Sequence, residues 1–147
     1  MDCKELFQDC LQELFVLNNL TVKEASPATQ ISPQQLYRYM NGESIPSLKN
    51  ATKIAEYFSC SFDYLFGLTD KYIKEEYKTT TTPNARFREL LKTQGYSRYK
   101  IHKATGLEEK RLFDWFHDLR SPSLNNLYTI AKTFACSLDY LAGRYKI

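Results

Sequence analysis

The apolar residues of this chain recur mostly at intervals of three and four, which is the period of helices that bury one face. Residues 31–48 illustrate the pattern. Ser32 and Pro33 predict a helix start, because serine caps a free N–H and proline fits the first helical position, and Gly42 predicts its end. Three apolar residues share the inner face: Leu36, Tyr39 and Met40. The outward face is suited to contact a partner: Pro33, Gln34, Tyr37, Arg38 and Asn41.

The second half of the chain repeats the first at a constant offset of 76 residues. Of the 57 positions from 11 to 67, 18 are identical to the residue 76 positions later, without a gap. The identities are densest where residues 48–67 meet residues 124–143. Similarity of a chain to itself at a fixed spacing indicates that one structural unit has been duplicated. We therefore expect two domains of the same fold.

Each copy divides into about five short helices. In the first copy we expect them at residues 3–17, from Thr21 onwards, from Ser32 to Gly42, from Ser47 onwards, and at residues 62–66. In the second copy we expect them at residues 87–93, 97–105, 108–117, 123–134 and 137–142. Pro27 leaves two possibilities for the second helix, which either stops early or restarts at Ser26, because proline inside a helix removes a hydrogen bond. No stretch shows the pattern of a strand, so the predicted fold class is all-α.

The two copies and the segment between them predict the domain boundaries. We expect the first domain at residues 1–68, a linker at residues 69–85 and the second domain at residues 86–147. The linker contains four consecutive threonines before Pro83, a sequence that disfavours a helix and predicts extended chain. With 147 residues, the chain has room for two small domains that each bury a core.

Charge is distributed unevenly between the two halves. The net charge is +3 overall, but residues 1–70 hold 5 basic and 9 acidic side chains, whereas residues 71–147 hold 15 basic and 8 acidic ones. The halves therefore carry −4 and +7. A positive field raises both the encounter rate and the affinity for phosphates. The basic half is the obvious candidate for binding a polyanion.

The sequence also restricts location and chemistry. It contains no run of about 18 apolar residues, and its polar N-terminus is unlike a signal peptide, so we expect a cytoplasmic protein without membrane contact. The cysteines lack metal-ligand spacing, and we expect reduced thiols that pack as small hydrophobes: Cys3, Cys10, Cys60 and Cys136. No phosphate-binding glycine loop, metal cluster or activated nucleophile is recognisable. We expect no cofactor, no metal site and no catalysis.

A combined pattern of residues occurs in both copies. In the first copy it consists of Thr21, Ile31, Ser32, Leu36, Tyr39, Asn41, Gly42, Pro46, Ser47, Leu48, Ile54 and Ala55, followed by residues 61–67. In the second copy it consists of Ser97, Ala104, Thr105, Gly106, Leu107, Leu112, Trp115, Pro122, Ser123, Leu124, Ile130 and Ala131, followed by residues 137–143. With this pattern, each copy resembles the helix-turn-helix domain of the phage repressor and Cro family, also called the XRE family. The resemblance implies two tandem five-helix lambda-repressor-like domains joined by a linker.

The resemblance also implies that the third helix of each copy enters the major groove of double-stranded DNA. In the first copy Gln34 and Arg38 are the expected base readers, because glutamine pairs with adenine and arginine with guanine through two hydrogen bonds. Three residues flank them: Gln35, Tyr37 and Asn41. Four others are expected at phosphates, at or near helix N-termini: Thr21, Lys23, Ser47 and Lys49.

The second copy offers a more basic flank and a less suitable reading face. Its expected base contacts are Lys110, Phe113 and Asp114. An aspartate accepts a hydrogen bond from a cytosine amine and a phenylalanine packs against a thymine methyl group. The expected phosphate contacts are Ser97, Arg98, Lys100, Arg111, Arg120 and Ser123. Acids facing phosphates repel, so in the alternative interpretation the aromatic residues of this helix serve packing or contact a protein.

The leading hypothesis is a sequence-specific transcriptional regulator, a repressor, that uses both copies on a non-palindromic site and has the option of forming a homodimer. The alternative is a protein-interaction module, such as an antitoxin-like or phage adaptor, in which the second copy docks a protein partner. The two differ in their response to salt. Affinity that comes from neutralising phosphates falls steeply as salt rises, whereas affinity that comes from a hydrophobic surface is unchanged or increases.

Overall fold

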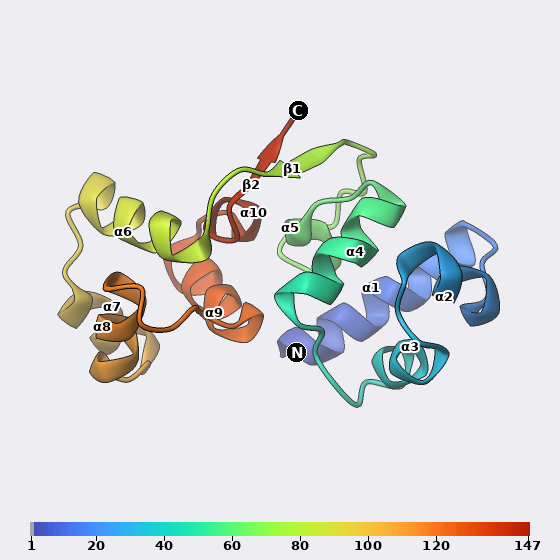
Figure 1. The fold of residues 1–147 in the computed structure, drawn as a ribbon, viewed down its shortest axis with the longest axis horizontal. Coiled ribbons are helices and arrows are strands. Elements are labelled where there is room, and N and C mark those ends of the chain that lie inside the picture. The colour runs from blue at the N-terminus through green and yellow to red at the C-terminus, as the bar shows by residue number, and fades with distance from the viewer. Residues whose placement is uncertain (1) are drawn as a thin grey trace. The chain divides into compact units, whose positions relative to one another are not determined.

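The computed structural model describes residues 2–147, which form two compact units. The first unit extends to Tyr77 and the second covers Lys78–Lys146. The helices of the first unit are α1 (Cys3–Leu17), α2 (Val22–Thr29), α3 (Pro33–Met40), α4 (Leu48–Phe58) and α5 (Phe62–Leu65) (Figure 1). Those of the second are α6 (Pro83–Gln94), α7 (Arg98–Thr105), α8 (Glu109–Phe116), α9 (Leu124–Phe134) and α10 (Leu138–Leu141). The prediction of two five-helix domains in an all-α fold is confirmed.

Most of these helices start at a side-chain cap. A serine, threonine or aspartate oxygen accepts a backbone N–H of the first turn at every described helix except α8. Such a cap contributes about 1 kcal/mol to a helix. At α8 the cap position holds Glu108, whose side chain makes no capping bond. Helix α8 therefore depends on tertiary contacts more than its counterpart α3, which Ser32 caps.

Helix α2 differs from both possibilities expected for it, since it runs through Pro27 without a break. Its start is held by a reciprocal capping box between Thr21 and Glu24, and its end by Gln30 in the left-handed conformation with φ of 59°. The buried side chains of Ala25 and Thr29 attach it to the core. Packing and caps therefore outweigh the hydrogen bond that proline removes, which matters less in a helix of only two turns.

The segment around the threonines corrects two further expectations. A short two-stranded sheet pairs β1 (Tyr77–Thr79) with β2 (Arg144–Lys146), although no strand was predicted. The strands are three residues long, too short for an alternating pattern to be visible. Helix α6 begins at Pro83, four residues before the expected start, because Thr82 caps it and proline occupies its first position.

Aromatic residues dominate the interior of each unit. In the first unit the Phe7 ring packs on Tyr39 and Phe66, with ring centroids 5.6 and 5.2 Å apart. In the second unit the Phe87 ring packs edge-on against Trp115 at 5.6 Å. Tyr39 and Trp115 occupy equivalent positions of α3 and α8, and both are buried. Each third helix is thus anchored by one large aromatic side chain.

None of the four cysteines forms a disulfide in residues 2–147. Cys3, Cys10 and Cys60 are buried and Cys136 is half-buried. Burial raises the pKa of the Cys3 and Cys10 thiols to about 12. The Cys10 thiol donates to the backbone carbonyl of Tyr64 at 3.4 Å. At neutral pH these thiols therefore stay protonated and act as small core residues.

Candidate nucleic-acid interface

Helices α2 and α3, and likewise α7 and α8, are joined by a tight turn. The turn residue is Gln30 in the first unit and Gly106 in the second, with φ of 59° and 76°. A left-handed residue ends one helix and allows the next to leave at a steep angle. In the first unit the Lys53 ammonium donates to the Gln30 carbonyl at 3.3 Å. The same turn geometry thus forms with glycine or with glutamine.

Helix α3 presents a polar outward face, as the sequence predicts. Gln34, Tyr37, Arg38 and Asn41 are exposed, and the Tyr37 side chain is 55% exposed. Gln35 is only half-buried, and its side-chain amide donates to the Ser44 hydroxyl at 3.3 Å. No carboxylate lies on α3. This face therefore presents hydrogen-bond donors and acceptors to solvent, with no negative charge on its own helix.

Arg38 has one competing partner. Its Nε lies 3.8 Å from a carboxylate oxygen of Glu43, and the two side chains are 54% and 56% exposed. An exposed ion pair of this length contributes little, at most about 1 kcal/mol. The guanidinium is therefore only weakly held by Glu43 and remains available for another partner.

The first helix of each unit holds the end of the third helix through equivalent positions. In the first unit the side-chain amides of Gln8 and Gln12 donate to the Met40 carbonyl at 3.2 and 2.8 Å. In the second unit the side chains 76 residues later, Asn84 and Arg88, likewise donate to backbone carbonyls at the end of α8. These positions were not predicted as functional. The duplication provides the signal that could have found them, because polar side chains recur there at the same offset.

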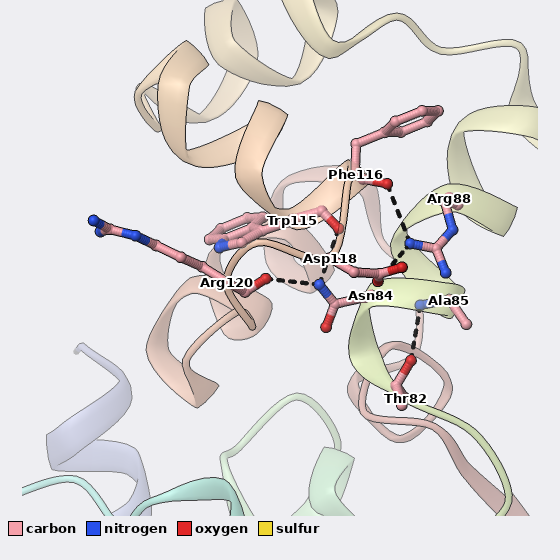
Figure 2. A network of polar contacts seen from close by, with 8 residues as sticks. All are labelled: Thr82, Asn84, Ala85, Arg88, Trp115, Phe116, Asp118 and Arg120. Atoms are coloured by element: carbon pink, nitrogen blue, oxygen red, sulfur yellow. Dashed lines mark hydrogen bonds and ion pairs between the residues drawn. The ribbon is translucent and has the colours of Figure 1, made fainter.

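Figure 2 shows this clamp in the second unit. The buried Asn84 amide donates to the carbonyls of Trp115 and Arg120 at 2.9 and 2.7 Å. Arg88 donates to the Phe116 carbonyl at 3.2 Å and pairs with Asp118 at 2.7 Å. Together they satisfy backbone carbonyls at the C-terminus of α8 and in the following loop. The orientation of α8 is therefore set from α6.

Substituting Asn84→Asp is expected to destabilise the protein by about 2–3 kcal/mol, because the buried Trp115 carbonyl and the partly buried Arg120 carbonyl lose their donor and meet a carboxylate. Urea unfolding followed by circular dichroism measures the change. The exposed Asn125→Asp on α9 is the matched control and should unfold like the parent. Equal stability of the two variants would show that the clamp contributes nothing.

The expected phosphate contacts of the first unit are all exposed: Thr21, Lys23, Ser47 and Lys49. The hydroxyls of Thr21 and Ser47 accept N–H groups of Glu24 and Asn50 as helix caps. The Glu24 carboxylate in turn accepts the Thr21 N–H and hydroxyl at 3.1 and 2.9 Å. A negative charge thus lies at the start of α2. Helix α4 begins without any acid, so its N-terminus is the better phosphate site.

Asp114 corrects the sequence prediction for the second unit. It was expected to face DNA, but its side chain is 4% exposed and lies 3.2 Å from the Lys110 ammonium and 3.4 Å from the Arg120 guanidinium. The carboxylate turns inward because two cations, one a turn earlier on α8 and one in the following loop, enclose it. Asp114 is therefore unavailable to a base, and it neutralises part of the charge of Lys110 and Arg120.

The remaining predicted residues of the second unit divide by exposure. The exposed ones are Ser97, Lys100, Lys110, Arg111, Phe113, Arg120 and Ser123. Arg98 is half-buried instead, with its guanidinium 5.2 Å from the Phe113 ring centroid and 5.1 Å from that of Phe116. The Lys100 ammonium lies over the Tyr96 ring at 4.3 Å. Sequence alone did not reveal that these two cations stack on aromatic rings.

The repeated geometry of two helices, a tight turn and an exposed second helix defines a tandem helix-turn-helix protein. The helix-turn-helix family model matches residues 11–65 and 87–141, and the chain belongs to this family. The predicted duplication of an XRE-type domain is confirmed, and the chain is a DNA-binding regulator of that kind. No curated protein and no solved structure matches the chain.

Two further properties concern the part of the chain that the structure describes. No helix within residues 2–147 has the length and apolar character needed to cross a membrane. Within the same residues, no group of three histidine, cysteine or carboxylate side chains converges in a way suited to a metal ion.

Proposed function

We propose that the chain is a transcriptional repressor that reads DNA bases mainly with its first copy and grips the phosphate backbone with both. The observation that carries the proposal is the contrast between α3 and α8. The exposed face of α3 holds Gln34 and Arg38 and no acid, whereas α8 starts with two exposed glutamates and its one aspartate faces inward. Glutamine and arginine side chains discriminate adenine and guanine in the major groove.

In this proposal Gln34 and Arg38 contact bases and Gln35, Tyr37 and Asn41 flank them. Backbone contacts come from Lys23, Ser47 and Lys49 in the first copy and from Arg111 and Ser123 in the second. Because the faces of α3 and α8 differ, the preferred site has two unlike halves. Recognition helices of helix-turn-helix dimers lie about 34–36 Å apart, one turn of DNA, and the proposed site places the two copies of this chain at the same spacing.

Selection of bound sequences from random double-stranded DNA tests the proposal. We expect one well-defined half-site from the first copy, with a second, weakly specified stretch about one helical turn away. Two unlike half-sites that are both strongly specified would contradict the division of roles, because they require both copies to read bases. If the bound DNA showed no common sequence, sequence-specific reading would be contradicted altogether.

Asp114→Asn is expected to raise the affinity for DNA severalfold and to steepen its salt dependence. The substitution keeps the shape of the side chain but releases Lys110 and Arg120 from a buried carboxylate. Each additional phosphate neutralised steepens the slope of log affinity against log salt by about 0.9. Fluorescence anisotropy over a salt series measures the slope. The exposed linker substitution Asp70→Asn is the control, and an unchanged slope for Asp114→Asn would contradict the neutralising role.

A second candidate function is docking of a protein by the aromatic side of the second copy. Phe113 is 43% exposed and Tyr99 is 59% exposed, and cations stack on both rings. Exposed aromatic residues beside arginine are typical of protein interfaces. Under this alternative Phe113→Ala abolishes partner binding and leaves DNA affinity unchanged. Loss of DNA binding in Phe113→Ala would contradict this alternative.

A further inference from the structure

The two units share a hollow at equivalent positions, but they line it differently. In the first unit a hollow of about 720 Å³ is lined mostly by uncharged side chains, including Gln12, Val16, Leu20, Val22 and Met40. In the second unit a hollow of about 530 Å³ is lined at the matching positions by Arg88, Lys92, Tyr96, Arg98 and Phe116. We call this second one the basic hollow. Three cations have replaced a glutamine and two valines around the same cavity.

One guanidinium nitrogen in the basic hollow lacks a hydrogen-bond partner. The Nη1 atom of Arg98 is buried and makes no hydrogen bond, while the guanidinium lies against the rings of Phe113 and Phe116. A buried donor without an acceptor is costly, and a charged one more so. Lys92 lies at the rim and is exposed, without an ion pair among the described residues. The basic hollow is therefore prepared to receive a carboxylate beside aromatic rings.

The first unit carries a surface of the opposite kind on α1. Four carboxylates lie at intervals of three or four residues along one side of the helix: Asp2, Glu5, Asp9 and Glu13. We call them the acidic face. All four are exposed, and none has an ion-pair partner within residues 2–147. The face ends at Val16, whose side chain is 79% exposed. An apolar group thus follows the carboxylates on the same side of α1.

We propose that the acidic face of α1 in one copy of this chain docks on the basic hollow in the second unit of another copy. Carboxylates of Asp9 and Glu13 pair with the Lys92 ammonium and with the part of the Arg98 guanidinium that lines the hollow, and Val16 packs against the rings of Tyr96 and Phe116. Every copy carries both surfaces, one in the acidic half and one in the basic half. The contact is head-to-tail, so it leaves a free surface at each end and adds further copies. The proposal is independent of which copy reads bases.

Sedimentation equilibrium of the full chain without DNA tests this contact. We expect the average mass to rise above the 17.2 kDa of one chain with increasing concentration at low salt, and to return to it at about 0.5 M salt, where surface charges are screened. A chain that stays monomeric at all concentrations overturns the proposal. Association that does not respond to salt overturns it as well, because the contact is built on charge.

Paired charge reversal gives the sharper measurement. Asp9→Lys with Glu13→Lys in one chain, or Lys92→Glu with Arg98→Glu in another, should each weaken self-association about tenfold. An equimolar mixture of the two variant chains should associate again, because the two reversed surfaces match and the unaltered acidic face of one variant meets the unaltered basic hollow of the other. Absence of association in the mixture overturns the proposal. Glu56→Lys and Lys132→Glu, both exposed and outside these surfaces, are the controls and should associate like the parent.

Two further measurements on the variants of the basic hollow are needed: whether they fold, and how tightly they bind DNA. If Arg98→Glu fails to fold, Lys92→Glu alone, at an exposed position, is mixed with the acidic-face variant in its place. If the hollow variants associate like the parent but bind DNA about tenfold more weakly, the basic hollow belongs to the phosphate backbone and the proposal is overturned.

Discussion

Replacing Gln34 and Arg38 together with alanine is expected to lower the affinity for the selected DNA site by about 2–6 kcal/mol, or roughly 30-fold or more. Each side chain lies on the exposed face of α3 and is the type that pairs with one base through two hydrogen bonds. Affinity for unrelated DNA should fall much less, since it depends on phosphates. Gel-shift titration on selected and scrambled duplexes measures the ratio of the two affinities.

The control variant removes the same kinds of side chain, a glutamine and a cation, from positions outside the third helices. Gln94→Ala and Lys132→Ala remove an exposed glutamine and an exposed cation from α6 and α9, away from either third helix, and should bind like the parent. Unchanged discrimination in the Gln34 and Arg38 variant would refute the first copy as reader. Loss of discrimination on substituting Lys110 and Arg111 instead would move base reading to α8.

Arg144→Met is expected to lower the free energy of unfolding by about 3–5 kcal/mol. The Arg144 guanidinium lies 2.8 Å from the Asp139 carboxylate, and the two side chains are only 3% and 6% exposed. Removing one member takes the buried opposite charge away from the other, which costs more than the pair contributes. Urea unfolding monitored by Trp115 fluorescence reports on this unit, because it contains the only tryptophan.

A second variant distinguishes the charge from the packing. Combining Asp139→Asn with Arg144→Met removes both charges, and most of the lost stability should return. If the double variant is as unstable as Arg144→Met, the loss comes from packing at the end of α10 and not from the charge of Asp139. A loss below about 1 kcal/mol in the single variant would place this pair among ordinary surface ion pairs.

Local signals predicted the helical organisation well. Ser32, Ser47, Ser61, Ser97, Ser123 and Ser137 mark helix starts that the structure contains. Capping depends on the few residues around one helix end, so it is visible in sequence. The same rule would have placed the start of α6 at Thr82 and Pro83. The run of threonines before them suggested extended chain instead, and β1 shows that part of this segment is indeed extended.

The candidate site was predicted less completely. Helical period placed Gln34, Arg38 and Phe113 on outward faces, where the structure has them. It placed Asp114 there too, at the position equivalent to Arg38. A position at the edge of a helix faces solvent or interior according to its partners, and the decisive partner of Asp114 is Arg120, beyond the end of α8. The half-buried position of Arg98 was not visible in the sequence for the same reason, because the rings that hold it belong to α8.

By itself, the sequence determined that this protein is a duplicated all-helical chain with two unlike third helices, because period, caps and repeat spacing are properties of neighbouring residues. The tertiary structure decided which charges are available. It buried Asp114 and Asp139 against cations, stacked Arg98 and Lys100 on aromatic rings, and left the acids of α1 exposed. How strongly a charged side chain can interact with a binding partner depends on its burial and on its contacts with other helices. Those become known only when the helices are packed.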